Sequence, residues 1–99
     1  MAIQHTVVFR LVHPLDSAES AAFLADGRRL LTSIPGVQHF AVHRQISPKS
    51  DLEHRFSMVF EDEAAYEAYS AHPTHTAFVA ERWVPEVAEF QEYDFVDAA

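Results

Sequence analysis

Hydrophobic and polar residues alternate in two segments of the chain, one near its start and one past its middle. Between Ile3 and Val12, one set of alternate side chains is apolar apart from His5. The segment from His54 to Glu61 repeats this arrangement and begins with its own histidine. A period of two with β-branched and aromatic residues is typical of a strand buried on one face. The pattern therefore predicts two strands whose apolar faces each carry one histidine.

Between these strands, apolar residues recur at steps of three and four, which indicates a helix with one apolar stripe. Asp16 or Ser17 can cap its start, and Pro35 with Gly36 ends it. Gly27 lies inside this helix, where glycine costs about 1 kcal/mol relative to alanine. We expect Gly27 to leave space above the sheet.

The remaining segments complete an alternating order of strands and helices. Residues 37–46 predict a strand, 47–51 a loop and 88–96 the last strand, while a helix capped by Asp62 runs to about Ala71. After His72-Pro73, Thr74 caps a short helix that Pro85 ends. The order β-α-β-β-α-β predicts one domain over residues 1–99, an α/β (α+β) two-layer sandwich of the ferredoxin-like type. In this plan we expect the first and third strands to be central, parallel neighbours.

The second face of the two central strands is neither fully apolar nor fully polar. It carries Thr6, Val8, Ser57 and Val59. Such a face is too apolar to lie well in water, and a second sheet packed on it would cover it. A chain of 99 residues also has a thin core, because it buries only about 60–65% of its unfolded surface. We therefore expect a homodimer with the two sheets face to face.

The charge and cysteine content exclude several classes of partner and site. Fifteen acidic residues against seven lysines and arginines give a net charge of −8, which argues against a nucleic-acid partner. The absence of cysteine excludes disulfides, thiolate metal sites and thiol nucleophiles. The alternating N-terminal segment does not resemble a signal peptide, and no apolar stretch approaches the ~18 residues of a membrane span. We expect a cytoplasmic protein that does not enter a membrane.

Several histidines and one tyrosine are candidates for chemistry. On parallel strands His5 and His54 would converge on the helix-facing side, and His75 shares a helical face with Phe78 that points toward the sheet. Tyr69 lies at the end of the preceding helix. A phenol and an imidazole in an apolar pocket suit proton abstraction next to a carbonyl, with no metal or organic cofactor.

Two other interpretations of the histidines remain open. Each can be a buried, hydrogen-bonded core residue, and His72 before proline can tie down a helix end. Three converging imidazoles can also hold Zn²⁺ or Cu²⁺. Because proline splits His72 from His75, the two rings need not share a face, and we expect no metal site.

The most specific motif in the chain is Tyr69-Ser-Ala-His72-Pro73-x-His75-x-x-Phe78. The chain resembles the stress-responsive dimeric A/B-barrel (Dabb) family over essentially its whole length. The other segments that carry the resemblance are Ile3-x-His5-x-Val7-x-Phe9, the Phe60-Glu61 step into a helix and the closing Tyr93-Asp94-Phe95. The resemblance implies a ferredoxin-like monomer whose sheet packs on a twin's sheet to form a dimeric α/β barrel. A related family, the small quinone-forming monooxygenases, fits the His-Pro-x-His string less well.

The resemblance also implies a site. In the olivetolic acid cyclase-type proteins of the family, a tyrosine and a histidine close a linear polyketide by aldol condensation, and they match Tyr69 and His75 by motif position. Two departures, Gly27 in place of a tyrosine and Glu92 in place of an aliphatic residue, argue against carrying over the cyclases' own substrate. The expected substrate-binding residues are His5, Val7, Phe9, Phe23, His54, Phe56, His72 and Phe78.

Two functions follow from these observations. One is cofactor-free cyclase or isomerase chemistry on an enolisable, polyketide-like compound. The alternative is a non-catalytic dimeric module that binds a small molecule or protects against stress. Both need a cavity, but only the first needs Tyr69 and His75 within hydrogen-bond reach across it. A purely structural dimer would have the cavity filled by apolar side chains.

Overall fold

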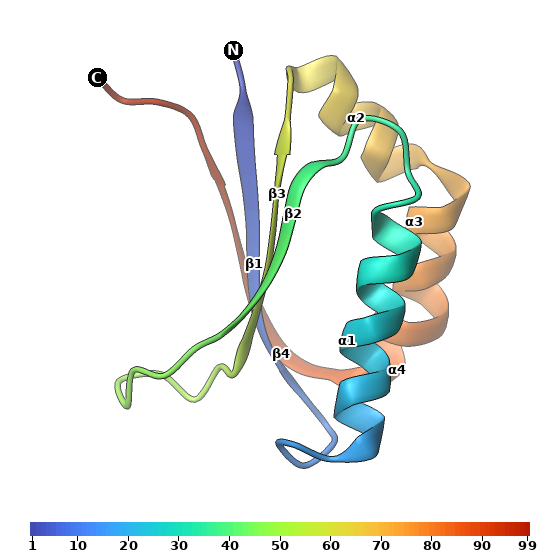
Figure 1. Ribbon diagram of the computed structural model, residues 1–99, viewed down its shortest axis with the longest axis vertical. Coiled ribbons are helices and arrows are strands. Elements are labelled where there is room, and N and C mark those ends of the chain that lie inside the picture. Colours follow the sequence, from blue (N-terminus) through green and yellow to red (C-terminus); the bar gives the residue numbers. More distant parts are fainter.

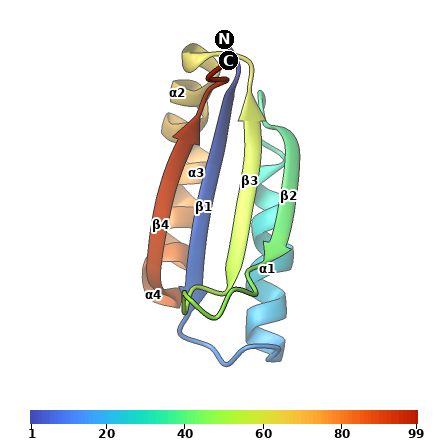
Figure 2. The same cartoon turned by 90° about the vertical axis from the view of Figure 1, so that its left-hand side faces the viewer.

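Strands and helices alternate along the chain in the computed structural model, which describes residues 1–99. The strands form one four-stranded sheet in the order β2-β3-β1-β4, and all helices lie against one of its faces (Figure 1). The other face carries no helix and is turned toward the viewer in Figure 2. These two layers confirm the predicted ferredoxin-like fold. The elements are β1 (Ile3–Leu11), α1 (Ala18–Leu31), β2 (Gln38–Arg44), β3 (His54–Phe60), α2 (Glu63–Ala71), α3 (Pro73–Phe78), the π-helical turn η1 (Val79–Trp83), α4 (Val84–Glu86) and β4 (Val87–Phe95).

The central strands β1 and β3 run antiparallel, so the predicted parallel pairing is wrong. The helical crossover makes β1 and β2 run in the same direction, and the loop from β2 into its neighbour β3 reverses the chain. The pairing places His5 opposite Met58, and Phe9 opposite His54. At about 3.3 Å per residue, the two histidines are separated by roughly 13 Å along the sheet. They cannot meet in one pocket.

Side-chain caps begin the first two helices. Ser17 caps α1, and its Oγ accepts a hydrogen bond from the backbone N–H of Ser20 at 3.1 Å. α1 ends at Leu31, before the predicted stop at Pro35. Asp62 caps α2 as predicted, with its Oδ1 2.9 Å from the backbone nitrogen of Ala65. Both caps satisfy backbone donors that the first helical turn leaves free.

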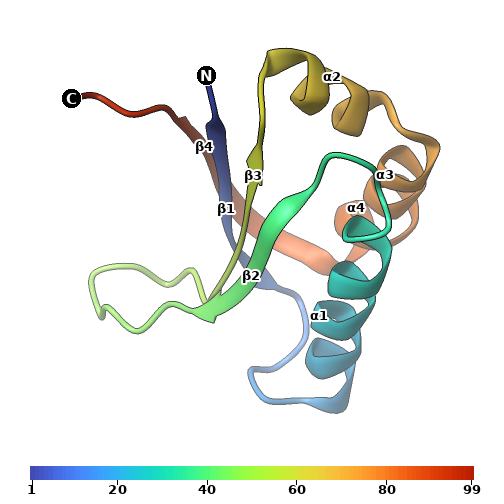
Figure 3. The same ribbon diagram turned by 45° about the horizontal axis from the view of Figure 1, so that its top comes forward.

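The helical segment after α2 differs from the prediction at both ends. His72, not Thr74, caps α3, and its Nδ1 accepts from the backbone N–H of Thr74 at 3.1 Å. Pro73 takes the first helical position, where a missing N–H costs nothing. Pro85 lies inside α4 and does not end the segment, so β4 begins at Val87. Figure 3 shows α3 and α4 on the same side of the sheet as α1. No helix combines the length and the apolar character that crossing a membrane requires.

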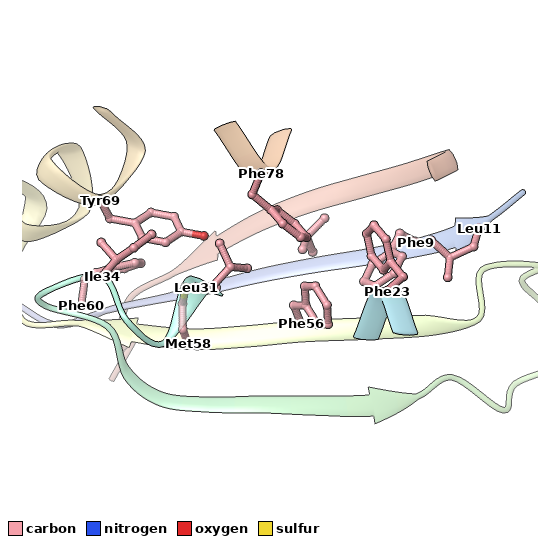
Figure 4. Packing of buried hydrophobic residues seen from close by; sticks show 11 residues of the cluster. Phe9, Leu11, Phe23, Leu31, Ile34, Phe56, Met58, Phe60, Tyr69 and Phe78 are labelled. Atoms are coloured by element: carbon pink, nitrogen blue, oxygen red, sulfur yellow. The ribbon is translucent and has the colours of Figure 1, made fainter. Parts of the chain in front are cut away.

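Six of the eleven residues in the buried core between the sheet and the helices are aromatic (Figure 4). The ring of Phe9 lies 4.8 Å from that of Phe56 and 5.8 Å from that of Phe23, centroid to centroid. Fully burying a side chain of this size contributes about 1.5–3 kcal/mol. The buried core consists of Val7, Phe9, Leu11, Phe23, Leu31, Ile34, Phe56, Met58, Phe60, Tyr69 and Phe78.

Gly27 does not leave empty space above the sheet, contrary to expectation. A Cβ atom at this position would lie 2.6 Å from Cζ and 2.9 Å from Cε2 of Phe56. The missing side chain therefore lets the Phe56 ring pack directly against the backbone of α1. Phe9, Phe23 and Phe40 also pack around this ring.

We predict that Gly27→Ala destabilises the protein by up to about 2 kcal/mol. Overpacking against Phe56 costs about 1–3 kcal/mol, and the better helix propensity of alanine returns about 1 kcal/mol. Chemical denaturation of Gly27→Ala, Phe56→Leu and the double variant measures the coupling. The alanine should be harmless or stabilising once Phe56 is leucine. Additive effects of the two changes would show that the contact does not limit residue 27.

Candidate functional site

A cavity of about 270 Å³ lies between the sheet and the helices, near the edge strand β4. Its volume is close to the lower end of the range of about 300–1,000 Å³ for small-molecule sites. Phe90 and Glu92 of β4 line it and are themselves exposed, which places its mouth at this edge of the sheet. The lining residues are His5, Val7, Leu31, Phe56, Met58, Tyr69, His75, Phe78, Val79, Trp83, Phe90 and Glu92.

His75 enters the cavity from the first turn of α3, with a fixed orientation. Its Nδ1 lies 3.0 Å from the backbone carbonyl of Ser70. Because a carbonyl only accepts, Nδ1 carries the proton, and Nε2 of the neutral ring keeps its lone pair. Burial lowers the pKa of His75, although the hydrogen bond to Ser70 opposes this shift. The ring is therefore neutral at neutral pH and able to accept a proton.

Tyr69 brings a hydroxyl group to the same cavity from the last turn of α2. Its side chain is 3% exposed, and its ring lies 4.6 Å from the His75 ring and 4.9 Å from the Phe60 ring. The hydroxyl points along the sheet over Leu31 (Figure 4), and no side chain or backbone group of the protein hydrogen-bonds to it. Burial raises the pKa of Tyr69, as do Tyr66 and Glu92, so the phenol stays protonated and can donate.

His5 is held in place by Asp94 and Tyr66. Its Nδ1 lies 2.7 Å from Oδ1 of Asp94, its cross-strand partner on β4. The hydroxyl of Tyr66 donates to the other Asp94 oxygen at 3.1 Å and lies 2.9 Å from the same ring nitrogen. Nε2 of His5 lies 3.8 Å from Oε2 of Glu92. Asp94 thus fixes the imidazole so that Nε2 is the nitrogen turned toward the Glu92 side of the cavity.

The cavity brings together six of the residues expected there: His5, Val7, Phe56, Tyr69, His75 and Phe78. Four others lie outside it. Phe9 and Phe23 are completely buried in the aromatic core, at the end of the sheet away from Tyr69. His54 lies beside Phe9 because the central strands are antiparallel. His72 caps α3 with its ring nitrogen, so its alternative interpretation as a helix tie was correct.

Sequence reasoning missed Asp94 and Tyr66. Period-two alternation in the last strand places Phe90, Glu92 and Asp94 on one face, which was a sufficient signal for Asp94. Tyr66 lies three residues before Tyr69 on α2, on the same helical face. No group of three histidine, aspartate or glutamate side chains is arranged to hold a metal ion.

Fold and site together define a ferredoxin-like domain with a histidine- and tyrosine-lined cavity at one sheet edge. The family model of the stress-responsive A/B barrel domain matches residues 3–97, and the chain belongs to this family. No functionally curated protein matches it.

Solved structures show the same fold. A Dabb family protein with a ferredoxin-like fold from Mesorhizobium loti is 52% identical, with a TM-score of 0.97 over 99% of this chain and 98% of that one. A dimeric ferredoxin-like protein from Thermobifida fusca is 20% identical, with a TM-score of 0.81 over 98% and 92% of the two chains. The hydroxynitrile lyase of Passiflora edulis is 15% identical, with a TM-score of 0.84 over 99% and 95%.

We predict that His54 makes the protein less stable in mild acid. Burial lowers the pKa of His54, and its buried Nε2 has no hydrogen-bond partner within the chain. Below about pH 6.5 the unfolded chain therefore binds a proton at His54 more readily than the folded chain does. As the pH is lowered, the free energy of unfolding decreases. His54→Leu should reduce this fall, as measured by denaturation between about pH 8 and pH 5.

The pKa of His75 is also lowered, so His75 too makes the free energy of unfolding decrease in acid. Some of this decrease should therefore remain in His54→Leu. His43→Gln is the matched control, since His43 is exposed on β2. An unchanged pH profile in His54→Leu would contradict the assignment.

Proposed function

We propose that the protein binds a small enolisable carbonyl compound in this cavity and moves a proton on it without a cofactor. The observation that carries the proposal is the pairing of a neutral His75, oriented by the Ser70 carbonyl, with the unpartnered hydroxyl of Tyr69. One group is a proton acceptor and the other a hydrogen-bond donor, and both line one mostly apolar cavity. This combination suits proton removal next to a carbonyl.

In the proposed reaction, Nε2 of His75 takes a proton from the carbon adjacent to the ligand carbonyl. The Tyr69 hydroxyl hydrogen-bonds the carbonyl oxygen, which gains negative charge as the enolate forms. A cyclase outcome follows if the enolate carbon attacks a second carbonyl of the same molecule, whose oxygen then takes up the proton. An isomerase outcome follows if His75 returns the proton to a different atom. His5, held by Asp94, is a second group able to exchange a proton with the ligand.

One observation favours the alternative, a module that binds without catalysis. The rings of Tyr69 and His75 lie 4.6 Å apart, but no hydrogen bond joins their polar atoms. Most of the lining is apolar, which is sufficient for binding alone. In a catalytic site, a ligand carbonyl and its neighbouring carbon would have to bridge these two groups.

We further propose that the functional unit is a homodimer formed by the helix-free sheet faces. Tyr93 and Phe95 are 46% and 50% exposed on this face, and their rings stack at 6.1 Å. Val8 and Val59 are half-buried there beside the buried Thr6. A semi-apolar sheet face of this kind suits sheet-on-sheet packing. The Thermobifida fusca structure of the same fold is described as dimeric, which supports the proposal.

The proton-transfer proposal predicts that the protein accelerates exchange of the methyl protons of acetophenone for deuterium in D₂O, followed by NMR. His75→Gln should lower the exchange rate constant by about 10²–10⁴, the usual effect of removing a general base. Tyr69→Phe keeps the ring and removes one oxyanion donor, so we expect a loss of about 10²–10³. Because the pKa of His75 is lowered, activity should fall only at a pH below about 6.5.

His43→Gln is again the control, since exposed His43 lies outside the cavity. If both site variants bind acetophenone and exchange its protons as the wild type does, the catalytic roles are wrong. If the wild type binds enolisable ketones but exchanges none, the binding module is the function.

The dimer proposal predicts a sedimentation mass of about twice the 11.2 kDa of the chain. Tyr93→Glu should shift the equilibrium toward monomer, because it buries a charge in the interface. Tyr93 is half-exposed in the single chain, so the fold should survive, as circular dichroism would show. Ala77→Glu, on the exposed side of α3, should leave the mass unchanged. A wild-type monomer at micromolar concentration would refute the dimer.

A further inference from the structure

The cavity contains a carboxylate but no cationic side chain that carries a permanent charge. Glu92 is the only aspartate or glutamate in its lining, and the lining includes no lysine or arginine. The Glu92 side chain is 54% exposed, and its Oε2 lies 3.8 Å from Nε2 of His5. Glu92 thus lies at the mouth of the cavity, close to His5, which is hydrogen-bonded to Asp94.

No lysine or arginine of the cavity lining compensates this negative charge. Asp94 lies on the same face of β4 and adds a second carboxylate behind His5. Arg82 of η1 directly precedes the lining residue Trp83 in the sequence. Its guanidinium already forms ion pairs with Asp26 and Glu86. The chain as a whole carries a net charge of −8. A negatively charged ligand would therefore meet repulsion both on approach and at the mouth.

We infer that Glu92 selects ligands by charge, so that the cavity accepts neutral or cationic carbonyl compounds and rejects carboxylates. A hydroxyl, amide or amine at the far end of such a ligand donates to Glu92, while the carbonyl lies at Tyr69. Only the carbonyl end of this assignment rests on the proposed function. The charge preference follows from the placement of Glu92 and holds for a binding module as well.

A series of three aryl methyl ketones tests the inference, because its members share one ketone and differ in charge. These are 4-acetylbenzoate, 4-acetylbenzamide and 4-acetylbenzylamine, which are anionic, neutral and cationic. Binding is measured by calorimetry at about pH 8, because burial lowers the pKa of His75 and that ring is neutral at this pH. The fluorescence of Trp83, the single tryptophan of the chain, reports occupancy of the cavity itself.

We expect the wild type to bind the amide and the amine more tightly than the carboxylate. In Glu92→Gln the carboxylate should gain about fivefold in affinity and the amine should lose about fivefold, while the amide changes little. Fivefold corresponds to about 1 kcal/mol, the interaction of two charges about 4 Å apart in a well-solvated setting such as the half-exposed Glu92. Opposite shifts for the two charged ligands are a signature that a merely structural role of Glu92 does not produce.

Glu67→Gln is the matched control, because it removes the same charge from an exposed position on α2 outside the cavity. It should leave all three affinities unchanged. Equal binding of carboxylate and amide by the wild type, a parallel loss of all three ligands in Glu92→Gln, or binding of none of them would overturn the inference. Proton exchange is measured separately, so selective binding without exchange overturns catalysis while supporting the charge selection.

Discussion

The geometry of the site depends on the helix break at His72-Pro73. In an uninterrupted helix the backbone N–H of Thr74 would donate to the Ser70 carbonyl, but it donates to the ring of His72 instead. The Ser70 carbonyl is thereby left for the Nδ1 of His75, which fixes the tautomer and direction of that ring. The same break keeps Tyr69 at the end of one helix and His75 at the start of the next, with their rings 4.6 Å apart. The helix break at His72-Pro73 thus determines both the position of the proposed base and which of its ring nitrogens carries the proton.

The second determinant of the site is the position of β4 at the edge of the sheet. An edge strand has one paired neighbour, so its side chains can be polar and exposed where central strands must be apolar. β1 pairs with β4 in a register that sets Val7 opposite Glu92 and His5 opposite Asp94. The carboxylates therefore reach the cavity from its open side, while β1 and β3 supply an apolar floor. This arrangement explains how a small core contains a polar cluster without burying an unpaired charge.

Much of this architecture was predictable from local patterns. Alternation correctly assigned the helix-facing side of β1 and β3, including His5, because a period of two leaves no choice of face. Strand direction was not predictable in the same way, since alternation is identical for parallel and antiparallel pairs. The wrong prediction that β1 and β3 are parallel is the reason that His54 was expected in the cavity. Gly27 was misjudged because a missing side chain has two opposite explanations, an open space or a close neighbour. Only the position of the Phe56 ring distinguishes them. Proline after His72 indicates that His72 can tie down a helix end, but the effect of this cap on the Ser70 carbonyl depends on hydrogen bonds that no residue pattern encodes.

The sheet connects the cavity to the face on which we propose that a second copy packs. Successive residues of β4 point to opposite sides, so Asp94, which holds His5, lies between Tyr93 and Phe95, which are exposed on the other face. As an edge strand, β4 is held in the sheet only by its pairing with β1. Covering Tyr93 and Phe95 would therefore restrict the strand that positions Asp94, and through it the imidazole of His5. In the proposed dimer, the partner would stabilise the site without contributing a residue to it, and dimerisation and ligand affinity would be thermodynamically linked.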